Sequence, residues 1–378
     1  MQSPSRSPIT GSSRGCFLKG DRHSGFTLVE VLVATVILTL ILALVLSITD
    51  QTSKIWKHST SEIQAFQNAR AAYGTLTQRL SQATLNTYLD YYDASQAVRT
   101  PGTASSFTPF YYARNSNLHF ISGQASTLVP GTANLHPGHA VFFQAPLGFT
   151  LTSGTSGNLP NLLNACGYYV EYNTDKDYLP PFLASSTAVK ERYRYRLMEF
   201  MQPTEANTIY KPITSPTTFS DYTKWFTDFL PPKVAIKDAP VRVLAENIVA
   251  LAILPELSPR DSTAQLVEND YSYDTRSGTI LKAGVPNVTH NQLPPLLRVV
   301  MIAIDEPSAQ RLSASGSTPP TLFTGLSPLP FTTTTSGDPN ADLDASRKQL
   351  EKALSDAKIN YRVFDTDIAI RGAKWSTQ

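Results

Sequence analysis

Cysteine is scarce in this chain: the 378 residues contain only Cys16 and Cys166. No apolar run precedes Cys16, which argues against a lipoprotein signal there. If the segment that holds Cys16 is removed, Cys166 stands alone, and a single cysteine cannot form an intrachain disulfide. The folded part must therefore be stabilised by its core. Hydrophobic residues make up 41% of the chain, enough for one large or two small domains.

An excess of positive charge is also absent. The formal net charge is +2. Residues 1–25 carry +3, because four basic residues outnumber Asp21, and the rest of the chain therefore carries −1; the four are Arg6, Arg14, Lys19 and Arg22. Without a basic excess after residue 25, bulk electrostatics give no reason to expect a nucleic-acid partner.

Proline is missing between Pro8 and Pro101, and charge is nearly missing between Phe26 and Thr49, where Glu30 is the only charged residue. This apolar run is long enough to cross a membrane, which takes about 20 residues as a helix. A carboxylate inside such a span is unfavourable in lipid and is a functional candidate by default. The basic residues before the span predict a cytoplasmic leader and a C-terminal part on the outside.

Three interpretations of this segment compete. A secretory signal has an apolar region of about 7–15 residues followed by a small-residue cleavage site. Here the apolar run is longer, and nothing like Ala-x-Ala follows it. A plain membrane anchor accounts for the length of the run but leaves Glu30 unexplained. A prepilin-like signal accounts for both features.

The residues Gly25-Phe26-Thr27-Leu28-Val29-Glu30 resemble the cleavage and methylation motif of type IV prepilins and pseudopilins. The resemblance implies that a prepilin peptidase cuts after Gly25 and that Phe26 becomes an N-methylated N-terminus. It also implies that Glu30 neutralises the amino group of a neighbouring subunit during assembly. An ammonium and a carboxylate are each unfavourable alone in lipid and offset each other when paired. The chain departs from the common pattern in its long leader and in the missing proline of its span.

Beyond the span, apolar residues recur at helical spacing, at Ile63, Phe66, Ala69, Tyr73, Leu76, Leu80 and Ala83. We expect one helix from about Phe26 to about Leu85, with this stripe packed under a head domain rather than against a coiled-coil partner. The organisation predicted is a cleaved leader at 1–25, a transmembrane helix at 26–49, an amphipathic continuation at 50–90 and an extracytoplasmic head at 91–378.

After Pro101, clusters of Pro, Gly, Ser and Thr separate short apolar or alternating runs. These runs predict strands at Leu118–Ile121, Ala140–Gln144, Gly167–Tyr172, Arg192–Phe200, Val241–Leu244, Ile248–Ile253, Leu297–Asp305 and Asn360–Ile370. The run 296–304 is apolar enough for a central strand buried on both faces. A helix is expected at Ala341–Ala357 with Leu343, Leu350 and Leu354 inward, and long loops are expected at 101–117, 122–138, 202–222 and 307–340. The predicted fold is α+β and pilin-like: a long N-terminal helix packed on an antiparallel sheet.

Two further resemblances refine this expectation. The segment Val243–Ile253 followed by Leu296–Ile304 is similar to the sheet of the larger minor pseudopilins of type II secretion. The chain also resembles the Verru_Chthon cassette protein C family of Verrucomicrobia. That resemblance rests on the signal, Thr-Ser-Lys-Ile-Trp-Lys at 52–57, the run from Gln292 to Glu306 and Asn-Tyr-Arg-Val-Phe at 360–364. It implies an operon of several pilin-like proteins but no biochemical activity.

One segment has the spacing of a metal loop. Oxygen-bearing side chains alternate at Asp338, Asn340, Asp342 and Asp344, as at the start of a calcium loop. Leu343 replaces the glycine that the turn needs, and Gln349 replaces the last glutamate. The alternative is a polar loop whose aspartates lie near a helix N-terminus, where the helix dipole favours them. We expect no cofactor, with calcium as a weak candidate.

Three other patterns involve histidines, arginines and aromatic residues. His136-Pro-Gly-His139 predicts a surface turn rather than a metal site. Arg192, Arg194 and Arg196 alternate with apolar residues and predict either a strand with one solvated face or a basic stripe for an acidic partner subunit or nucleic acid. The aromatic residues Trp225, Phe226 and Phe229 indicate core or a subunit interface more than a ligand platform.

No phosphate loop, metalloprotease motif, serine elbow or cysteine–histidine pair is present in the sequence, and we do not expect an enzyme. The sequence predicts a prepilin-like structural subunit of an inner membrane, with a periplasmic head, assembled into a pilus or pseudopilus that serves secretion or surface attachment. Its partners would be the prepilin peptidase and other pilin-like subunits. The alternative is a membrane-anchored binding protein whose head recognises a secreted substrate, a surface or DNA.

Overall fold

The computed structural model describes residues 25–95, 97–99, 104–132, 135–151, 161–184, 186, 189–209, 219–257, 267, 270–277, 289–313, 316–320, 326 and 330–373. The leader residues 1–24, with their basic residues and Cys16, lie outside this part. The chain forms two compact units, Met1–Lys57 and His58–Gln378. The second unit is called the head below. Helix α1 (Leu28–Leu80) contributes to both units.

The first unit consists, in its described part, of residues 25–57, nearly all of them the first half of α1. Every one of these residues is exposed, including the whole apolar run from Phe26 to Thr49. The helix contains a window apolar enough to cross a membrane, and none of that window is buried within the chain. Within the part of the chain that the structure describes, the apolar surface of this helix segment is therefore left uncovered.

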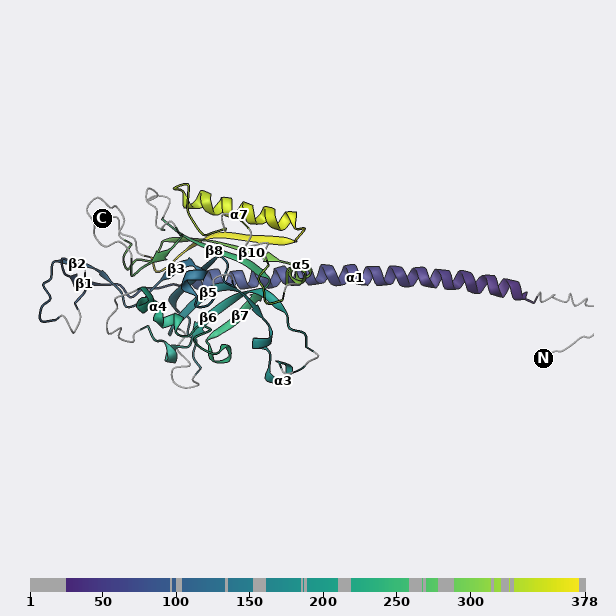
Figure 1. Cartoon of the computed structure of the whole chain (residues 1–378), viewed down its shortest axis with the longest axis horizontal. Helices are drawn as coiled ribbons and strands as arrows, with labels where there is room; N and C mark the ends of the chain where they lie inside the picture. The colour runs from purple at the N-terminus through teal and green to yellow at the C-terminus, as the bar shows by residue number, and fades with distance from the viewer. Residues whose placement is uncertain are drawn as a thin grey trace, which may run out of the picture. The chain divides into compact units, whose positions relative to one another are not determined.

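The head combines the second half of α1 with antiparallel sheets, as the α+β prediction requires (Figure 1). A six-stranded sheet has the order β7-β6-β5-β4-β3-β9, a three-stranded sheet has the order β11-β10-β8, and β1 and β2 form a hairpin. The strands are β1 (Tyr88–Tyr92), β2 (Tyr111–Asn115), β3 (Ile121–Gln124), β4 (His139–Pro146), β5 (Leu163–Thr174), β6 (Tyr193–Gln202), β7 (Val241–Glu246), β8 (Ile248–Glu256), β9 (Tyr273–Asp274), β10 (Leu296–Ile304) and β11 (Tyr361–Ala369).

The helices of the head after α1 are shorter. They are α2 (Ala125–Leu128), α3 (Pro181–Ala184), α4 (Phe219–Thr227), α5 (Glu306–Leu312) and α7 (Pro339–Asp356), with 3-10 turns η3 (Lys176–Tyr178), η4 (Thr204–Ala206) and η5 (Ile236–Asp238). Helix α7 lies along the three-stranded sheet (Figure 1). Its buried leucines are the three predicted ones, Leu343, Leu350 and Leu354. Asp338 caps the helix N-terminus by accepting hydrogen bonds from the amides of Asn340 and Ala341.

The second half of α1 is part of the main core of the head, and the predicted stripe is confirmed except for Ile63, which is exposed. Leu76 and Leu80 are fully buried, and the hydroxyl of Tyr73 donates to the carbonyl of Val299 in β10 (2.7 Å). This core also contains side chains of both larger sheets. A second core on the other face of the six-stranded sheet includes α4.

β10 is the central strand that its apolar run predicted. It pairs with β11 on one side and β8 on the other, both antiparallel, and Val299 to Ile304 are all buried. The pairing of β8 with β10 also places the segments compared above with pseudopilin sheets side by side.

The structure corrects several boundaries. α1 ends at Leu80 rather than near Leu85, because the amide of Thr84 donates to Gln144 in β4 (2.9 Å) and the chain joins the sheet. β3 begins at Ile121, where the predicted strand ended. The predicted loops at 101–117, 122–138 and 307–340 contain β2, α2 and α5. α5 forms because Asp305 caps it by accepting from the Ser308 amide (3.0 Å).

Replacing Leu76 by alanine tests the role of α1 in the core. We expect the free energy of unfolding to fall by about 2–5 kcal/mol, since the substitution removes fully buried methyl groups and leaves a cavity. Ile63→Ala on the same helix is the matched control and should cost less than about 1 kcal/mol. The measurement is the denaturant midpoint of the full chain in detergent. Equal losses in the two variants would contradict this packing.

Candidate functional site

Of the three residues that the prepilin motif singles out, Glu30 lies in the first turn of α1, and Gly25 and Phe26 precede the helix. Thr27 precedes the first helical residue, and its Oγ1 accepts a hydrogen bond from the Glu30 amide (3.2 Å). Oε2 of Glu30 in turn accepts from the Thr27 amide (2.9 Å) and from the Thr27 hydroxyl (3.0 Å). This reciprocal arrangement is a capping box, which satisfies two amide groups that a helix start leaves unpaired.

The capping box gives Glu30 a role within its own chain that sequence reasoning missed. The Thr-x-x-Glu spacing at residues 27–30 was the available signal. The box fixes the carboxylate at the helix N-terminus, where the helix dipole favours negative charge. Both hydrogen bonds described for the carboxylate are accepted by Oε2. Oε1 can therefore accept a hydrogen bond from a donor on another molecule.

Gly25 lies just before this turn in open surroundings. A Cβ atom built on Gly25 would meet no other atom within 4 Å. The fold of the chain itself therefore does not require glycine at this position. A requirement for glycine would have to come from a molecule that approaches the backbone there.

The four calcium candidates accept hydrogen bonds from groups at the start of α7 and from a neighbouring strand. Asp338 caps the helix, and Asp342 accepts from the amides of Thr335 (2.7 Å) and Ser336 (3.0 Å). Asn340 and Asp344 both accept from Arg298 of β10, at 3.0 and 2.8 Å. These contacts match the helix-start alternative. Among the described residues, no group of three or more His, Cys, Asp or Glu side chains is arranged to hold a metal ion.

The surface turn predicted at His136-Pro-Gly-His139 is wrong, because both histidines are buried. Gly138 adopts φ +75°, and a Cβ there would lie 2.4 Å from the carbonyl oxygen of Leu251. The turn is therefore pressed against β8. His139 accepts from the Ile253 amide through Nδ1 (2.9 Å), and its Nε2 lies 2.8 Å from the carbonyl oxygen of Phe331, to which it donates.

The three arginines of the predicted stripe all have partners within the chain, and the two that lie in β6, Arg194 and Arg196, are buried rather than solvated. β6 lies between β5 and β7, so both of its edges are paired. Arg196 is almost fully buried and donates to the carbonyl and side-chain oxygens of Asn173 (2.6 Å each). Arg194 forms an ion pair with Glu306 (2.9 Å). Arg192, half-exposed, pairs with Asp175 (2.8 Å).

The aromatic cluster after residue 224 is core, as predicted. Trp225 and Phe226 are buried, and Phe226 stacks on Phe142 of β4 with ring centroids 3.9 Å apart. Trp225 donates to Nδ1 of the buried His119 (3.0 Å), whose Nε2 lies 2.6 Å from Asp274. His119 is fully buried, and Trp225 and the side chain of Asp274 are nearly so, which makes these contacts part of the interior of the head.

A buried carboxylate joins α1 to the six-stranded sheet. Glu199 of β6 is fully buried and forms ion pairs with Arg79 in the last turn of α1 and with Arg242 of β7. The hydroxyl of Tyr168 also donates to it (2.9 Å). A buried carboxylate is stable only when its oxygens are paired. The ion pair between Glu199 and Arg79 therefore links the end of α1 to the six-stranded sheet. Sequence reasoning missed Glu199 because its partners lie far away along the chain.

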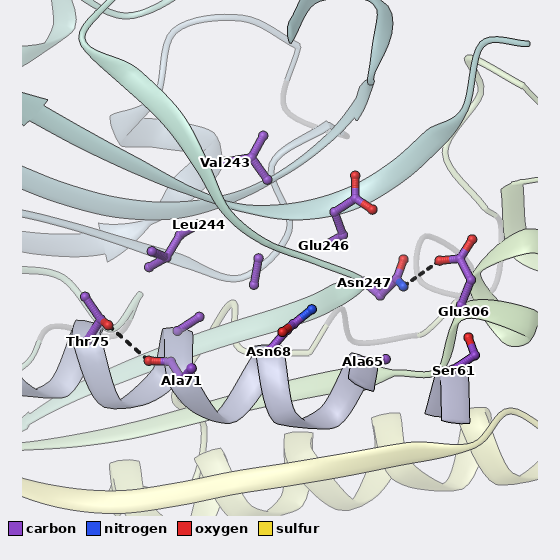
Figure 2. A pocket seen from close by; sticks show the side chains of 12 residues that line it. Ser61, Ala65, Asn68, Ala71, Thr75, Val243, Leu244, Glu246, Asn247 and Glu306 are labelled. Atoms are coloured by element: carbon purple, nitrogen blue, oxygen red, sulfur yellow. Dashed lines mark hydrogen bonds between the residues drawn. The ribbon is translucent and has the colours of Figure 1, made fainter. Parts of the chain in front are cut away.

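A groove of about 570 Å³ runs between α1 and β7, the edge strand of the six-stranded sheet (Figure 2). Small side chains of α1, such as Ala65 and Ala71, form one wall, and Val243 and Leu244 form another. The acidic residues at its end are already paired: Glu246 with Arg196 (3.2 Å), and Glu306 with Arg194 and with Nδ2 of Asn247 (2.9 Å). Burial acts to raise the pKa of Glu306, but these hydrogen bonds lower it below its usual value. An ionised, paired carboxylate is a poor general acid or base at neutral pH.

The comparisons with known proteins bear on the N-terminal segment alone. Residues 20–46 match the family described as the prokaryotic N-terminal methylation motif. No curated protein and no solved structure matches the chain. The motif indicates a type IV prepilin-like precursor, and together with the apolar first half of α1 it indicates a membrane-anchored protein with a single span.

The capping box can be tested by Thr27→Val, which removes the hydroxyl and keeps the side-chain volume. We expect faster hydrogen exchange of the Glu30 amide, because that amide loses its acceptor. Thr39→Val is the matched control, since the Thr39 hydroxyl only donates to the Val36 carbonyl (2.8 Å) in mid-helix. The measurement is amide exchange by NMR on the span in detergent micelles. Unchanged exchange at Glu30 would rule the box out.

The buried histidines predict loss of stability in acid. Burial lowers the pKa of His136 to about 4 and also lowers the pKa values of His119 and His139. The unfolded chain therefore takes up these protons first, and the free energy of unfolding falls as the pH drops below about 6.5. His136 alone accounts for a loss on the order of 3 kcal/mol between pH 6.5 and 4.

This dependence is measured from denaturant midpoints of the full chain in detergent at several pH values. His136→Gln should flatten the slope, whatever it does to stability at neutral pH, because one titrating group is removed. An identical slope in the variant and the unmodified chain would contradict the assignment.

Proposed function

We propose that this chain is a prepilin-like structural subunit, cleaved after Gly25 and assembled with other pilin-like subunits into a pilus or pseudopilus. The observation that carries the proposal is the methylation motif at residues 20–46, which ends in an apolar helix that its own chain leaves uncovered. A lipid bilayer covers that surface before assembly, and neighbouring subunits cover it afterwards. The filament would serve secretion or surface attachment.

The proposal gives each motif residue a role. The prepilin peptidase reaches the bond after Gly25 from the cytoplasmic face, since the basic leader stays inside and the head lies in the periplasm. Phe26 becomes the N-methylated N-terminus. Glu30 keeps its capping bonds through Oε2, and Oε1 accepts from the N-terminal ammonium of a neighbouring subunit. In a region of low dielectric, this pair offsets the unfavourable burial of each charge.

The lineage follows from the resemblance alone. If the chain is a Verru_Chthon cassette protein C, its partners are encoded beside it as further pilin-like proteins. The groove between α1 and β7, with its small side chains and paired carboxylates, supports a structural role rather than an enzymatic one.

Glu30→Gln separates the two roles of Glu30. Glutamine can replace glutamate in a capping box, so the helix start is retained, but the charge is lost. We expect normal cleavage after Gly25 and at least a tenfold drop in subunits recovered by crosslinking or in sheared filaments, roughly what one lost charge pair would cost. Thr27→Val is the matched control, because it weakens the cap and keeps the charge; it should assemble far better than Glu30→Gln.

Gly25→Val completes the set and should leave the leader attached, seen as a larger band on a gel. Since a side chain at Gly25 meets nothing in this fold, a processing defect reports the peptidase and not misfolding. Normal assembly of Glu30→Gln would show that the carboxylate acts only within its own chain. Normal processing of Gly25→Val would remove the main argument for a prepilin.

A further inference from the structure

Beyond the apolar run, the next two turns of α1 have a polar face. Asp50 is the first charged residue after Glu30. Lys54 and Lys57 follow it at intervals of four and three residues, which places all three on one side of the helix. The ammonium of Lys54 pairs with the Asp50 carboxylate (2.7 Å), and both side chains are exposed. Residues 50–57 are called the exit segment below.

The other side of these turns is apolar. Ile55 and Trp56 follow Ile48 by seven and eight residues, the spacing of a single helix face. Ile55 is 70% exposed and Trp56 is 74% exposed, so the part of the chain that the structure describes leaves both uncovered. They continue the uncovered apolar surface of the span without a break in the helix. Whatever covers them therefore adjoins the membrane.

The length of the uncharged run places the exit segment relative to a bilayer. From Glu30 to Asp50 the helix rises about 30 Å at about 1.5 Å per residue, which equals the thickness of a hydrocarbon core. The headgroup layer adds about 5–8 Å on each side. Trp56 follows Asp50 by about 9 Å, and side chains of a helix lean toward its N-terminus, here back toward the span. The indole ring is thereby brought to the level of the headgroups.

The two faces of the exit segment decide between classes of surroundings. The hydrocarbon core is excluded by Asp50 and the two lysines, which are unfavourable in lipid. Water alone would leave two large apolar side chains hydrated. The headgroup layer is apolar on one side and wet on the other, so it accommodates both faces. Tryptophan is enriched in this layer, because its ring is apolar and its N–H group is a hydrogen-bond donor.

We propose that Ile55 and Trp56 bind the phospholipid headgroup layer on the side of the membrane opposite the leader, and that this contact fixes the depth of the span. The indole N–H of Trp56 donates to a phosphate or ester oxygen. Lys54 and Asp50 offset each other, so Lys57 is the remaining charge of the exit segment and adds an attraction to the phosphates. The proposal rests on the single span and is independent of cleavage after Gly25 and of filament assembly.

The test is tryptophan fluorescence of the full chain in phosphatidylcholine bicelles. The chain has three tryptophans, so the difference between the unmodified chain and Trp56→Phe isolates the emission of Trp56. The lipid is brominated either near the headgroup end or near the methyl end of its acyl chains, and iodide is the aqueous quencher. We expect the shallow bromine to quench Trp56 more strongly than the deep bromine does, and we expect iodide to quench it only weakly.

Two positions on the same side of α1 are matched controls, each introduced in the Trp56→Phe background. Val45→Trp lies eleven residues earlier, about 16 Å deeper along the helix, and should be quenched mainly by the deep bromine. Ile63→Trp replaces an exposed residue of the head and should be quenched by iodide and by neither bromolipid. Because Trp56 is exposed within the chain, Trp56→Phe should leave the far-ultraviolet circular dichroism unchanged.

Three outcomes would overturn the proposal. If iodide quenches Trp56 as strongly as it quenches Ile63→Trp and neither bromolipid does, the residue lies in water. If no quencher reaches Trp56, a protein neighbour covers it instead of lipid. If the deep bromine quenches it most, the residue lies inside the hydrocarbon core and the depth is wrong. Because purified protein in a defined lipid is used, none of these outcomes bears on cleavage or assembly.

Discussion

No residue that the structure describes covers the first half of α1, and the role proposed for the chain depends on this constraint. Apolar side chains cover every face of the helix from Phe26 to Thr49, and none of them is buried. Such a helix is stable only where lipid or other apolar helices replace water. The capping box at Glu30 lies at the N-terminal end of this helix, and the basic leader precedes that end in the sequence. The charged residues next to the apolar run are therefore concentrated at its N-terminal end.

The second half of the same helix is covered by the rest of the head. Leu76 and Leu80 are buried in the main core, and Arg79 pairs with the buried Glu199. Between Leu28 and Leu80 there is no proline and one glycine, Gly74, so nothing in the sequence interrupts the hydrogen-bond ladder. A single element is thus the anchor of the first unit and a core element of the head. Substitutions near residue 76 therefore change the stability of the head. Substitutions near residue 30 change how the helix interacts with the lipid or the subunits around it.

Much of this architecture could be read from local patterns. The apolar run of β10, broken only by Arg298, the leucine spacing of α7 and the helical stripe after Ile63 each depend on residues close in sequence, and each predicted its element. The hairpin was missed although Tyr88-Leu-Asp-Tyr-Tyr92 has the composition of a strand, because the continuation of the helix was predicted to reach residue 90 and β2 falls within the predicted loop 101–117.

Buried charge could not be read in this way. Arg194 and Arg196 alternate along β6 like a solvated face, yet their partners Glu306 and Glu246 come from distant segments of the chain. The same holds for Glu199 and for His139. The capping box of Thr27 and Glu30 is the exception, since its spacing was visible in the sequence and only its meaning was overlooked.

Cysteine scanning along α1 tests the central claim that one helix serves two environments. Background is low once Cys16 is replaced by serine, because Cys166 is buried and burial raises the pKa of its thiol to about 11. In intact membranes, a membrane-impermeant maleimide should label Gln51→Cys and leave Val36→Cys and Ala72→Cys unlabelled. Detergent should then expose Val36→Cys but not the buried Ala72→Cys. Labelling of Val36→Cys in intact membranes at the rate of Gln51→Cys would contradict the account.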